Sequence, residues 1–164
     1  MIPEADIQTI KNLQLQRLAS QFQGVERILE GFNEAELGHP PSNGKWSAKQ
    51  QLAHLARYHE IFQERLRRIL EEDSPRFARY RAEEDAEWAH WQTLRCNAIT
   101  AKLEDLRAEL TEKLQKLPTD SYRRVGVHPT LGSMTLIDWL EFFLIHEGHH
   151  MYAIFLDLRG LPEN

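Results

Sequence analysis

The chain of 164 residues contains one cysteine, Cys96, so it has no means of forming a disulfide within itself. It also lacks any run approaching the roughly 18 apolar residues that a membrane-spanning helix requires. The first residues show neither the basic start nor the apolar stretch of a signal peptide. These absences argue against a disulfide-stabilised secreted protein and against a membrane protein, and they predict a cytoplasmic protein.

An excess of positive charge is absent as well. The formal net charge is −5 at pH 7, which gives no general attraction to nucleic acid. One arginine-rich segment, residues 65–81, is flanked by acidic residues that nearly cancel its charge. Its arginines are Arg65, Arg67, Arg68, Arg76, Arg79 and Arg81. We interpret this segment as a solvated, ion-paired helix end and expect no nucleic-acid partner.

Helical periodicity is present instead, in four long segments that lack internal proline. In the first segment, apolar residues recur every three or four positions from Leu15 to Phe32, which is the spacing of one helix face. The second segment opens with Ser47 and Gln50 in a capping-box pattern and ends at Ser74-Pro75. No segment shows the alternation that is typical of a strand.

The third predicted helix runs from about Glu84 to Leu117, and the fourth begins with Thr135 as its N-cap and ends near Gly160. Residues 33–46 and 118–134 contain several glycines and prolines, and we expect them to be long connections. The sequence therefore predicts an all-α fold, a four-helix bundle with long loops between helices 1–2 and 3–4. Its size fits one domain over residues 1–164.

The fourth helix is apolar over most of its circumference, which is unusual for a helix at the surface of a bundle. Its large apolar side chains are Trp139, Leu140, Phe142, Phe143, Leu144, Ile145, Met151, Tyr152, Ile154, Phe155 and Leu156. One bundle core cannot accept all of them, so we expect a second copy of the chain to cover the remaining face. The prediction is a homodimer.

Three of the eight histidines lie together on this helix, in the sequence His146-Glu147-Gly148-His149-His150. His146 and His150 are four residues and about 40° apart on a helix, so their rings are able to converge on one ion. Both lie on the stripe that should face the bundle interior, where each imidazole needs a polar partner. A metal ion would satisfy both rings, and the alternative is a pair of core histidines bonded to carbonyls or carboxylates.

The third ligand should come from another helix at a similar depth, and His54 on the second helix is the candidate. The two helices run parallel in an up-down-up-down bundle, or antiparallel if the connection near Pro75 crosses over. His59 lies about 140° around the helix from His54, so we expect it to serve in packing. His149 falls on a different stripe, and we expect an outer or interface role for it.

Three neutral imidazoles leave coordination positions open for water or substrate, as in catalytic metal sites. The predicted ligands are His54, His146 and His150 of one divalent ion, which could be zinc, nickel, iron or manganese. Two other metal motifs have weaker support. His146 to His150 matches the H-E-x-x-H metalloprotease pattern, but no downstream ligand and no sheet accompany it. Glu87-x-x-His90 and Glu147-x-x-His150 match a di-iron bundle, but their depths differ by roughly 20 Å.

The chain resembles the DinB-like (DinB/YfiT) superfamily of metal-dependent four-helix bundles in three stretches. They are Lys45–Leu55, Val127–Thr135 and His146–His150, and their order and spacing agree with the family over nearly the whole chain. The resemblance implies an often dimeric bundle whose metal ligands, carried over, are His54, His146 and His150. Some family members are thiol-dependent transferases and isomerases, and others are hydrolases.

We therefore expect a metal-dependent enzyme that acts on a small molecule, by S-transfer with a low-molecular-weight thiol or by hydrolysis. The alternative is a non-catalytic dimeric bundle in which a metal or small ligand only stabilises the fold. Open coordination positions facing a solvent-connected pocket favour the enzyme, and a closed site favours the binding module.

Overall fold

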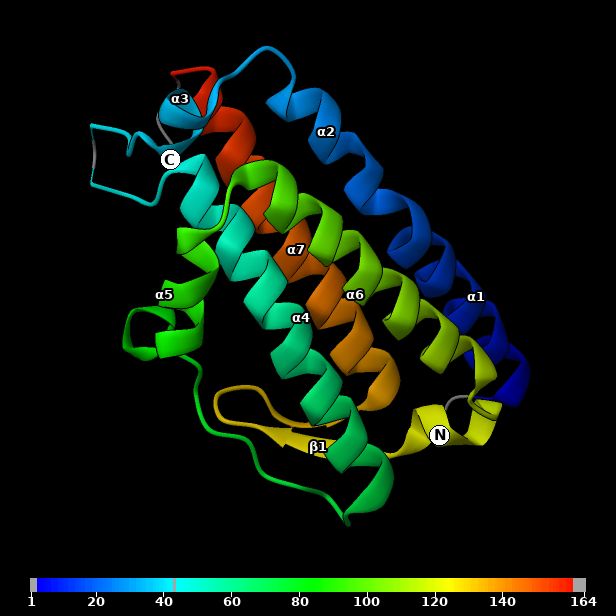
Figure 1. Cartoon of the computed structure of the whole chain (residues 1–164). Helices are drawn as coiled ribbons and strands as arrows, with labels where there is room; N and C mark the ends of the chain where they lie inside the picture. Colours follow the sequence, from blue (N-terminus) through cyan, green and yellow to red (C-terminus); the bar gives the residue numbers. More distant parts are fainter. Residues whose placement is uncertain (1–2, 43, 161–164) are drawn as a thin grey trace.

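The computed structural model describes residues 3–42 and 44–160 and contains four long helical columns (Figure 1). The first column is formed by α1 (Glu4–Ser20), a short 3₁₀ turn (Gln21–Gln23) and α2 (Gly24–Leu29). The others are α4 (Ala48–Glu71), α6 (Cys96–Lys116) and α7 (Leu136–Leu158). Both α1 and α4 pack against α6 and α7. The predicted four-helix bundle is confirmed.

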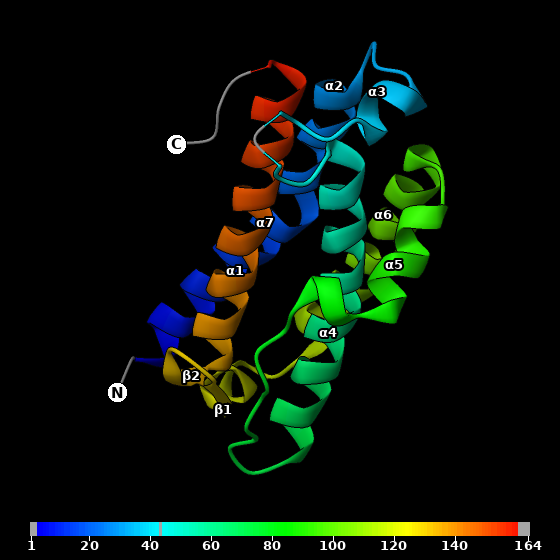
Figure 2. The same ribbon diagram turned by 90° about the vertical axis from the view of Figure 1, so that its left-hand side faces the viewer.

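The direction of the columns follows from a long crossover between α4 and α6. Both helices run downward in Figure 1, and the chain returns between them through residues 72–85 and α5 (Ala86–Thr93). As a result α4 and α7 lie side by side and run antiparallel (Figure 2). The sequence left open whether these two helices run parallel or antiparallel, and the structure has the antiparallel arrangement.

Side-chain capping boxes mark the starts of α4 and α7. Ser47 and Gln50 form the predicted capping box of α4, and Thr135 forms one with Asp138 at the start of α7. A further capping box, Asn33 with Glu36, starts the short helix α3 (Glu34–Gly38) inside the first connection. Each box satisfies backbone N–H groups that the first helical turn leaves unpaired.

The prediction of one continuous helix from Glu84 to Leu117 was wrong. A 3₁₀ turn (Ala82–Glu84) and α5 come first, and extended backbone at Leu94 and Arg95 separates α5 from α6. In one straight helix Trp91 and Cys96 would lie about 140° apart, so both could not face the core. The break allows both side chains to be buried. The first column was likewise predicted as uninterrupted and contains the 3₁₀ turn.

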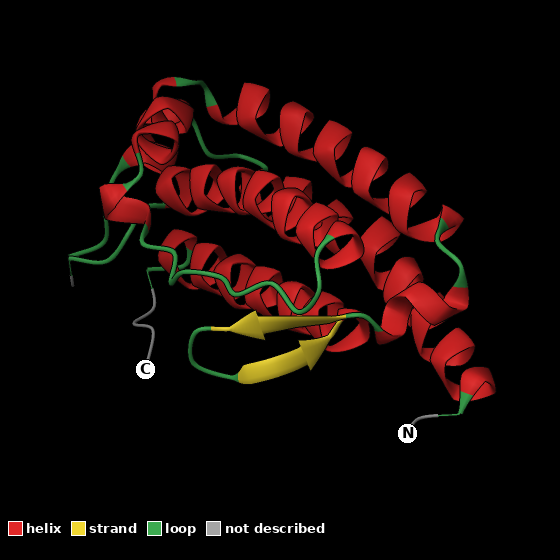
Figure 3. Ribbon diagram, turned by 90° about the horizontal axis from the view of Figure 1, so that it is seen from below, coloured by secondary structure: helices red, strands yellow, loops and turns green. Residues whose placement is uncertain are grey.

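The expectation that no strands occur was also wrong, because the second connection contains a hairpin (Figure 3). Its strands β1 (Val125–His128) and β2 (Gly132–Thr135) pair antiparallel, with His128 opposite Gly132. Gly126 is required here, since a Cβ atom at this position would lie 2.8 Å from Ile69 of α4 and 2.9 Å from Phe77. Its carbonyl accepts a hydrogen bond from the Trp139 indole at 3.2 Å. The hairpin is thereby held against the lower ends of α4 and α7.

The bundle buries much of the apolar surface of α7 but leaves part of it exposed. Its buried apolar residues are Leu136, Ile137, Trp139, Leu140, Phe143, Leu144, Ala153, Ile154 and Leu156. Only Ile145, Tyr152 and Phe155 are exposed large apolar side chains on this helix. Phe142 and Met151 are partly buried, so the bundle core does not accept all of the large apolar side chains of α7, as the sequence argument expected. Among the residues described, no helix is both long and apolar enough to cross a membrane.

The arginine-rich segment is ion-paired in part, as predicted. Arg67 pairs with Glu64 and Glu71, Arg68 pairs with Glu72, and Arg81 pairs with Glu84. Arg65 is the exception, because its side chain is buried with only 7% of the residue exposed.

Candidate metal centre

The structure brings His54, His146 and His150 together across the antiparallel α4 and α7. The Nε2 atom of His146 lies 3.1 Å from the Nε2 atom of His54 and 3.1 Å from that of His150. Ligand atoms from the three rings lie within 4.8 Å of one another. His59, His149 and Glu147 do not belong to this set of converging atoms.

These distances suit a shared ion better than hydrogen bonding among the rings. An imidazole nitrogen carries either one proton or one lone pair in the ring plane, so His146 Nε2 can bond only one of its two neighbours. A divalent ion accepts a lone pair from every ring, and nitrogens about 2.1 Å from zinc lie roughly 3–3.5 Å apart. The donor set therefore fits a metal ion.

Burial keeps the three imidazoles in the neutral form that binds metals. His54 is 5% exposed and His150 is 9% exposed, while His146 is half-buried. Desolvation, with a smaller contribution from His149, lowers the pKa of His54 to about 4. Desolvation and the neighbouring histidines lower the pKa of His146 to about 3, and they lower the pKa of His150 as well. All three rings are uncharged at pH 7.

A second contact orients His150. Its Nδ1 lies 2.6 Å from Oε1 of Gln51, so Nδ1–H donates to the amide oxygen and the lone pair remains on Nε2. The Nδ1 atoms of His54 and His146 are buried and have no partner among the described residues. The sequence reasoning missed Gln51, although its position three residues before His54 places it on the same helix face.

Aromatic side chains form the walls of the centre. The Tyr58 ring stacks on His146 with the centroids 4.0 Å apart, and Trp46 and Tyr80 lie 5.0 and 5.7 Å from His54. These rings come from α4, from the loop before it and from the crossover. They restrict the movement of the imidazoles and shield them from water, and the sequence reasoning did not identify them as part of the site.

His59, His149 and His90 lie outside the ligand set, as predicted. His59 is buried, and its Nδ1 lies 3.0 Å from the Leu55 carbonyl, as expected of a packing residue. His149 is exposed, and its ring centroid is 5.1 Å from that of His150. His90 and Glu87, the residues of the di-iron pattern, are exposed on α5, outside the converging set.

Glu147 does not have the role that a metalloprotease motif would give it. Its carboxylate is buried in an ion pair with Arg107 of α6 and accepts a hydrogen bond of 2.9 Å from Gln21. A general base must have its carboxylate free beside the bound water. Here the carboxylate is occupied by a cation from a different helix.

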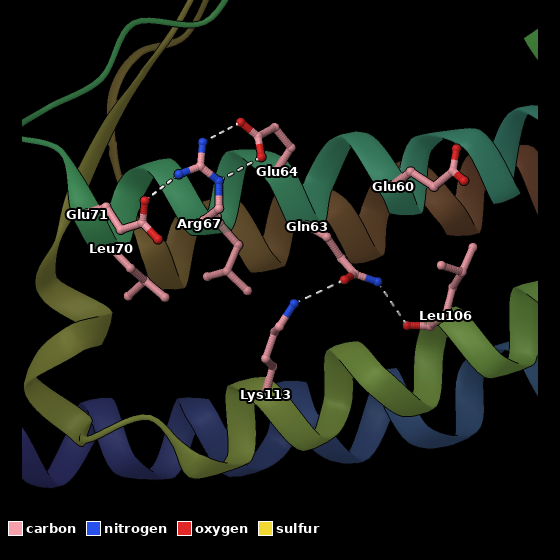
Figure 4. Close-up of a pocket in the computed structure, with 9 residues that line it drawn as sticks. Glu60, Gln63, Glu64, Arg67, Leu70, Glu71, Leu106 and Lys113 are labelled. Carbon is pink, nitrogen blue, oxygen red and sulfur yellow. Dashed lines mark hydrogen bonds and ion pairs between the residues drawn. The ribbon is translucent and has the colours of Figure 1, made fainter. Parts of the chain in front are cut away.

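A groove of about 490 Å³ lies between α4 and α6 (Figure 4). Leu66, Leu70 and Leu106 line it, together with charged residues at its rim. Gln63 bridges the groove by accepting from Lys113 and donating to the Leu106 carbonyl. None of the converging imidazoles belongs to its lining.

Comparison with protein families is decisive for the classification. The family model of the DinB superfamily matches residues 17–154. The chain belongs to the DinB superfamily. The match includes all three converging histidines, and it agrees with the resemblance that the sequence motifs indicated.

Two Bacillus subtilis (strain 168) proteins are relatives within this DinB superfamily. The uncharacterised protein YuaE is 25% identical over 136 residues, which are 75% of this chain and 83% of YuaE. YfiT, whose name proposes a metal-dependent hydrolase, is 26% identical over 131 residues, which are 79% of this chain and 74% of YfiT.

Two solved structures share the fold of this chain. The YfiT structure, described as an unusual four-helix bundle, aligns with a TM-score of 0.80 at 24% identity and covers 93% of this chain and 89% of YfiT. The mycothiol-dependent maleylpyruvate isomerase aligns with a TM-score of 0.67 at 16% identity and covers 93% of this chain and 61% of the isomerase. At these identities the alignments establish the architecture.

Proposed function

We propose that this DinB-superfamily protein binds one divalent metal ion through His54, His146 and His150 and uses it to transform a small molecule. The observation that carries the proposal is the double contact of His146 Nε2 with two other imidazole nitrogens at 3.1 Å. The relative YfiT, itself proposed to be a metal-dependent hydrolase, supports the same class of reaction.

The protein side chains would hold and orient the ion and the reactants. Three neutral imidazoles supply the ligands, and Gln51 holds His150 in the tautomer that presents Nε2. Tyr58, Tyr80 and Trp46 exclude bulk water from the ligand rings. When bound, such an ion acidifies a water molecule or stabilises a thiolate, which are the requirements of hydrolysis and of thiol-dependent S-transfer.

Two reaction classes remain within this proposal. Hydrolysis agrees with the name of YfiT, and a thiol cosubstrate agrees with the description of the mycothiol-dependent isomerase. A non-catalytic bundle stabilised by its metal is the competing function. The imidazole ligands alone do not select among zinc, nickel, iron and manganese.

The proposal is tested by elemental analysis of protein purified without a metal-affinity tag, followed by assays of the metal-loaded form. We expect close to one divalent ion per chain. We also expect turnover in a panel of activated esters or in a panel of electrophiles offered with low-molecular-weight thiols. A chelator should remove the activity, and the identified metal should restore it. A tightly held metal that gives no activity in either panel would favour the non-catalytic bundle.

Metal affinity should change little between pH 7.5 and pH 5.5. Protons compete with a metal only where they bind the ligand rings, and burial lowers the pKa of His54 to about 4 and that of His146 to about 3. Imidazoles with an ordinary pKa would begin to lose affinity below about pH 6.5. Zinc titration against a chelator of known pH dependence measures this, and a tenfold loss by pH 5.5 would contradict the prediction.

We also propose a homodimer formed through the exposed apolar residues of α7. Ile145 and Tyr152 are 59% and 57% exposed, and they lie two turns apart on one helix face. Light scattering of the purified 19.3 kDa chain should give twice that mass at micromolar concentration. Tyr152→Lys should give the monomer, and Leu131→Lys, an equally exposed apolar position outside α7, should not. A monomeric unmodified chain would eliminate this proposal.

A cytoplasmic location completes the proposed function. Cys96, the only cysteine, is a free, buried thiol, and a reducing compartment preserves it. Fractionation of the source cells, with detection of the native chain, tests the location, and its recovery outside the cytoplasm would contradict it.

A further inference from the structure

Arg65 is a buried cation that has no carboxylate partner. Its Nη1 donates to Tyr58 Oη at 3.1 Å, and its Nη2 donates to the Ala78 carbonyl at 3.4 Å. Neighbouring arginines on α4 differ, because Arg57 pairs with Asp85 and Glu60, and Arg68 pairs with Glu72. Within residues 3–42 and 44–160, no acidic side chain pairs with Arg65.

The surroundings of Arg65 reduce the cost of its burial without neutralising its charge. Its guanidinium carbon lies 5.6, 5.6 and 5.5 Å from the ring centroids of Tyr58, Phe77 and Trp139. Cation–π contacts stabilise a cation but supply no negative charge. A buried charge is normally paired, so this guanidinium is poised for an anion from outside the chain.

Part of the guanidinium is still available for binding. The Nε–H group of Arg65 has no acceptor in the described part of the chain. Its nitrogen is also not fully shielded from solvent. Arginine presents its N–H groups as a planar fork that matches a carboxylate or a phosphate. The spare donor is therefore suited to an oxyanion.

The guanidinium also lies next to the candidate metal centre. Tyr58 separates the two, because its ring is 5.6 Å from the Arg65 carbon and 4.0 Å from the His146 ring. The guanidinium carbon is therefore within about 10 Å of the His146 ring, close enough for charges to interact in a protein interior.

His128 of the hairpin adds a second donor on this side of the bundle. Its Nδ1 accepts hydrogen bonds from the backbone N–H groups of Thr130 and Leu131, at 3.2 and 3.0 Å. The proton of the neutral ring must then be on Nε2. Its ring lies 5.4 Å from Trp139 and 5.1 Å from Phe142, which in turn lies 6.3 Å from His146.

The balance of charge around the centre points to the same ligand. A divalent ion on three neutral imidazoles, with Arg65 nearby, makes a strongly positive region. The charged or titratable groups with the largest effects on the three ligand rings are His149, Arg65, His59 and the rings themselves, and none of these is a carboxylate. An anionic small molecule would supply the missing negative charge.

We infer that Arg65 binds the carboxylate or phosphate group of the small molecule whose reactive end lies at the three histidines. The inference rests on the proposed function, since it identifies the substrates of that site as anionic. It assigns Arg65 to substrate recognition.

Paired thiols test the inference in the cobalt-loaded protein, where a thiolate on the metal gives a charge-transfer absorption band. Each ω-mercapto acid of three to six carbons is compared with the ω-mercapto alcohol of the same length. We expect the protein to prefer the acid by about tenfold or more at one chain length. Arg65→Gln should abolish this preference. Arg68→Gln, which removes a half-buried arginine that also contacts Phe77, should retain it.

The outcomes separate the two proposals. Equal binding of acid and alcohol by the unmodified protein, or a preference that survives Arg65→Gln, would overturn the role of Arg65. Failure to bind cobalt would instead overturn the proposed metal centre. If Arg65→Gln does not fold, as judged by circular dichroism, Arg65→Lys is used, because it keeps the charge but loses the planar fork. It should lose most of the preference.

A metal-free measurement tests Arg65 independently of the metal centre. The ¹⁵N-resolved Nε–H resonance of Arg65 is followed while propionate or inorganic phosphate is added to the unmodified protein. A saturable shift with millimolar anion, absent from the Arg68 resonance, is expected, and the tighter of the two anions identifies the group. Absence of a shift with both anions would overturn the inference.

Discussion

Replacing His150 with alanine is expected to abolish tight metal binding, whereas His149→Ala should leave the affinity nearly unchanged. His150 Nε2 lies 3.1 Å from His146 Nε2, and its other nitrogen is held by Gln51. His149 is exposed and does not join the converging nitrogens. Loss of one of three ligands should cost more than tenfold in affinity, because even the loss of a group that orients a ligand costs about 10–100-fold.

Zinc titration against a competing chelator measures both variants under identical conditions. The two substitutions remove the same side chain from adjacent positions of α7, so they serve as a matched pair. Circular dichroism should show that both remain folded, since the core of the bundle does not depend on either ring. Equal weakening in the two variants, or a greater loss for His149→Ala, would show that the ligand set is wrong.

The agreement between sequence and structure is best where periodicity alone determines position. His146 and His150 face one direction because four residues make nearly one helical turn, whatever the rest of the bundle does. Capping boxes are equally local, and those of Ser47 and Thr135 form as predicted. Local rules were sufficient for these features.

Prediction failed where distant parts of the chain decide the structure. The break between α5 and α6 is required by the burial of Trp91 and Cys96 against other helices. The hairpin depends on Gly126 fitting against Ile69 and Phe77, contacts that no local pattern reveals. Arg65 resembles its solvated neighbours in the sequence, and it is buried because the crossover and Trp139 of α7 pack over it.

The burial of Glu147 could not be foreseen for the same reason. The H-E-x-x-H spacing would make this glutamate the general base beside a metal-bound water, but its helix position is about 100° from that of His146. It instead faces Arg107, which donates to both Glu147 and the Leu18 carbonyl. The pair is almost fully buried, with 6% and 1% of Arg107 and Glu147 exposed.

Glu147→Ala is therefore expected to lower the free energy of unfolding by about 3–5 kcal/mol, since it leaves the Arg107 charge buried without a partner. Arg107→Ala should have a similar cost. The double substitution Arg107→Met with Glu147→Leu should recover most of the loss, because an apolar pair of similar volume carries no buried charge. Urea denaturation of the metal-free protein measures all three variants against the unmodified chain.

The same variants distinguish a structural glutamate from a catalytic base. The double variant retains the three imidazoles, so its zinc affinity should stay within about tenfold of the unmodified value. A larger loss is expected only for a group that orients a metal ligand, since such a loss costs about 10–100-fold. If Glu147 served a metal-bound water, its loss would instead leave stability nearly intact and remove the activity of the metal-loaded protein. A Glu147→Ala variant whose free energy of unfolding lies within about 1 kcal/mol of that of the unmodified protein would contradict the structural role. Removing one partner of a buried ion pair destabilises a protein by more than that.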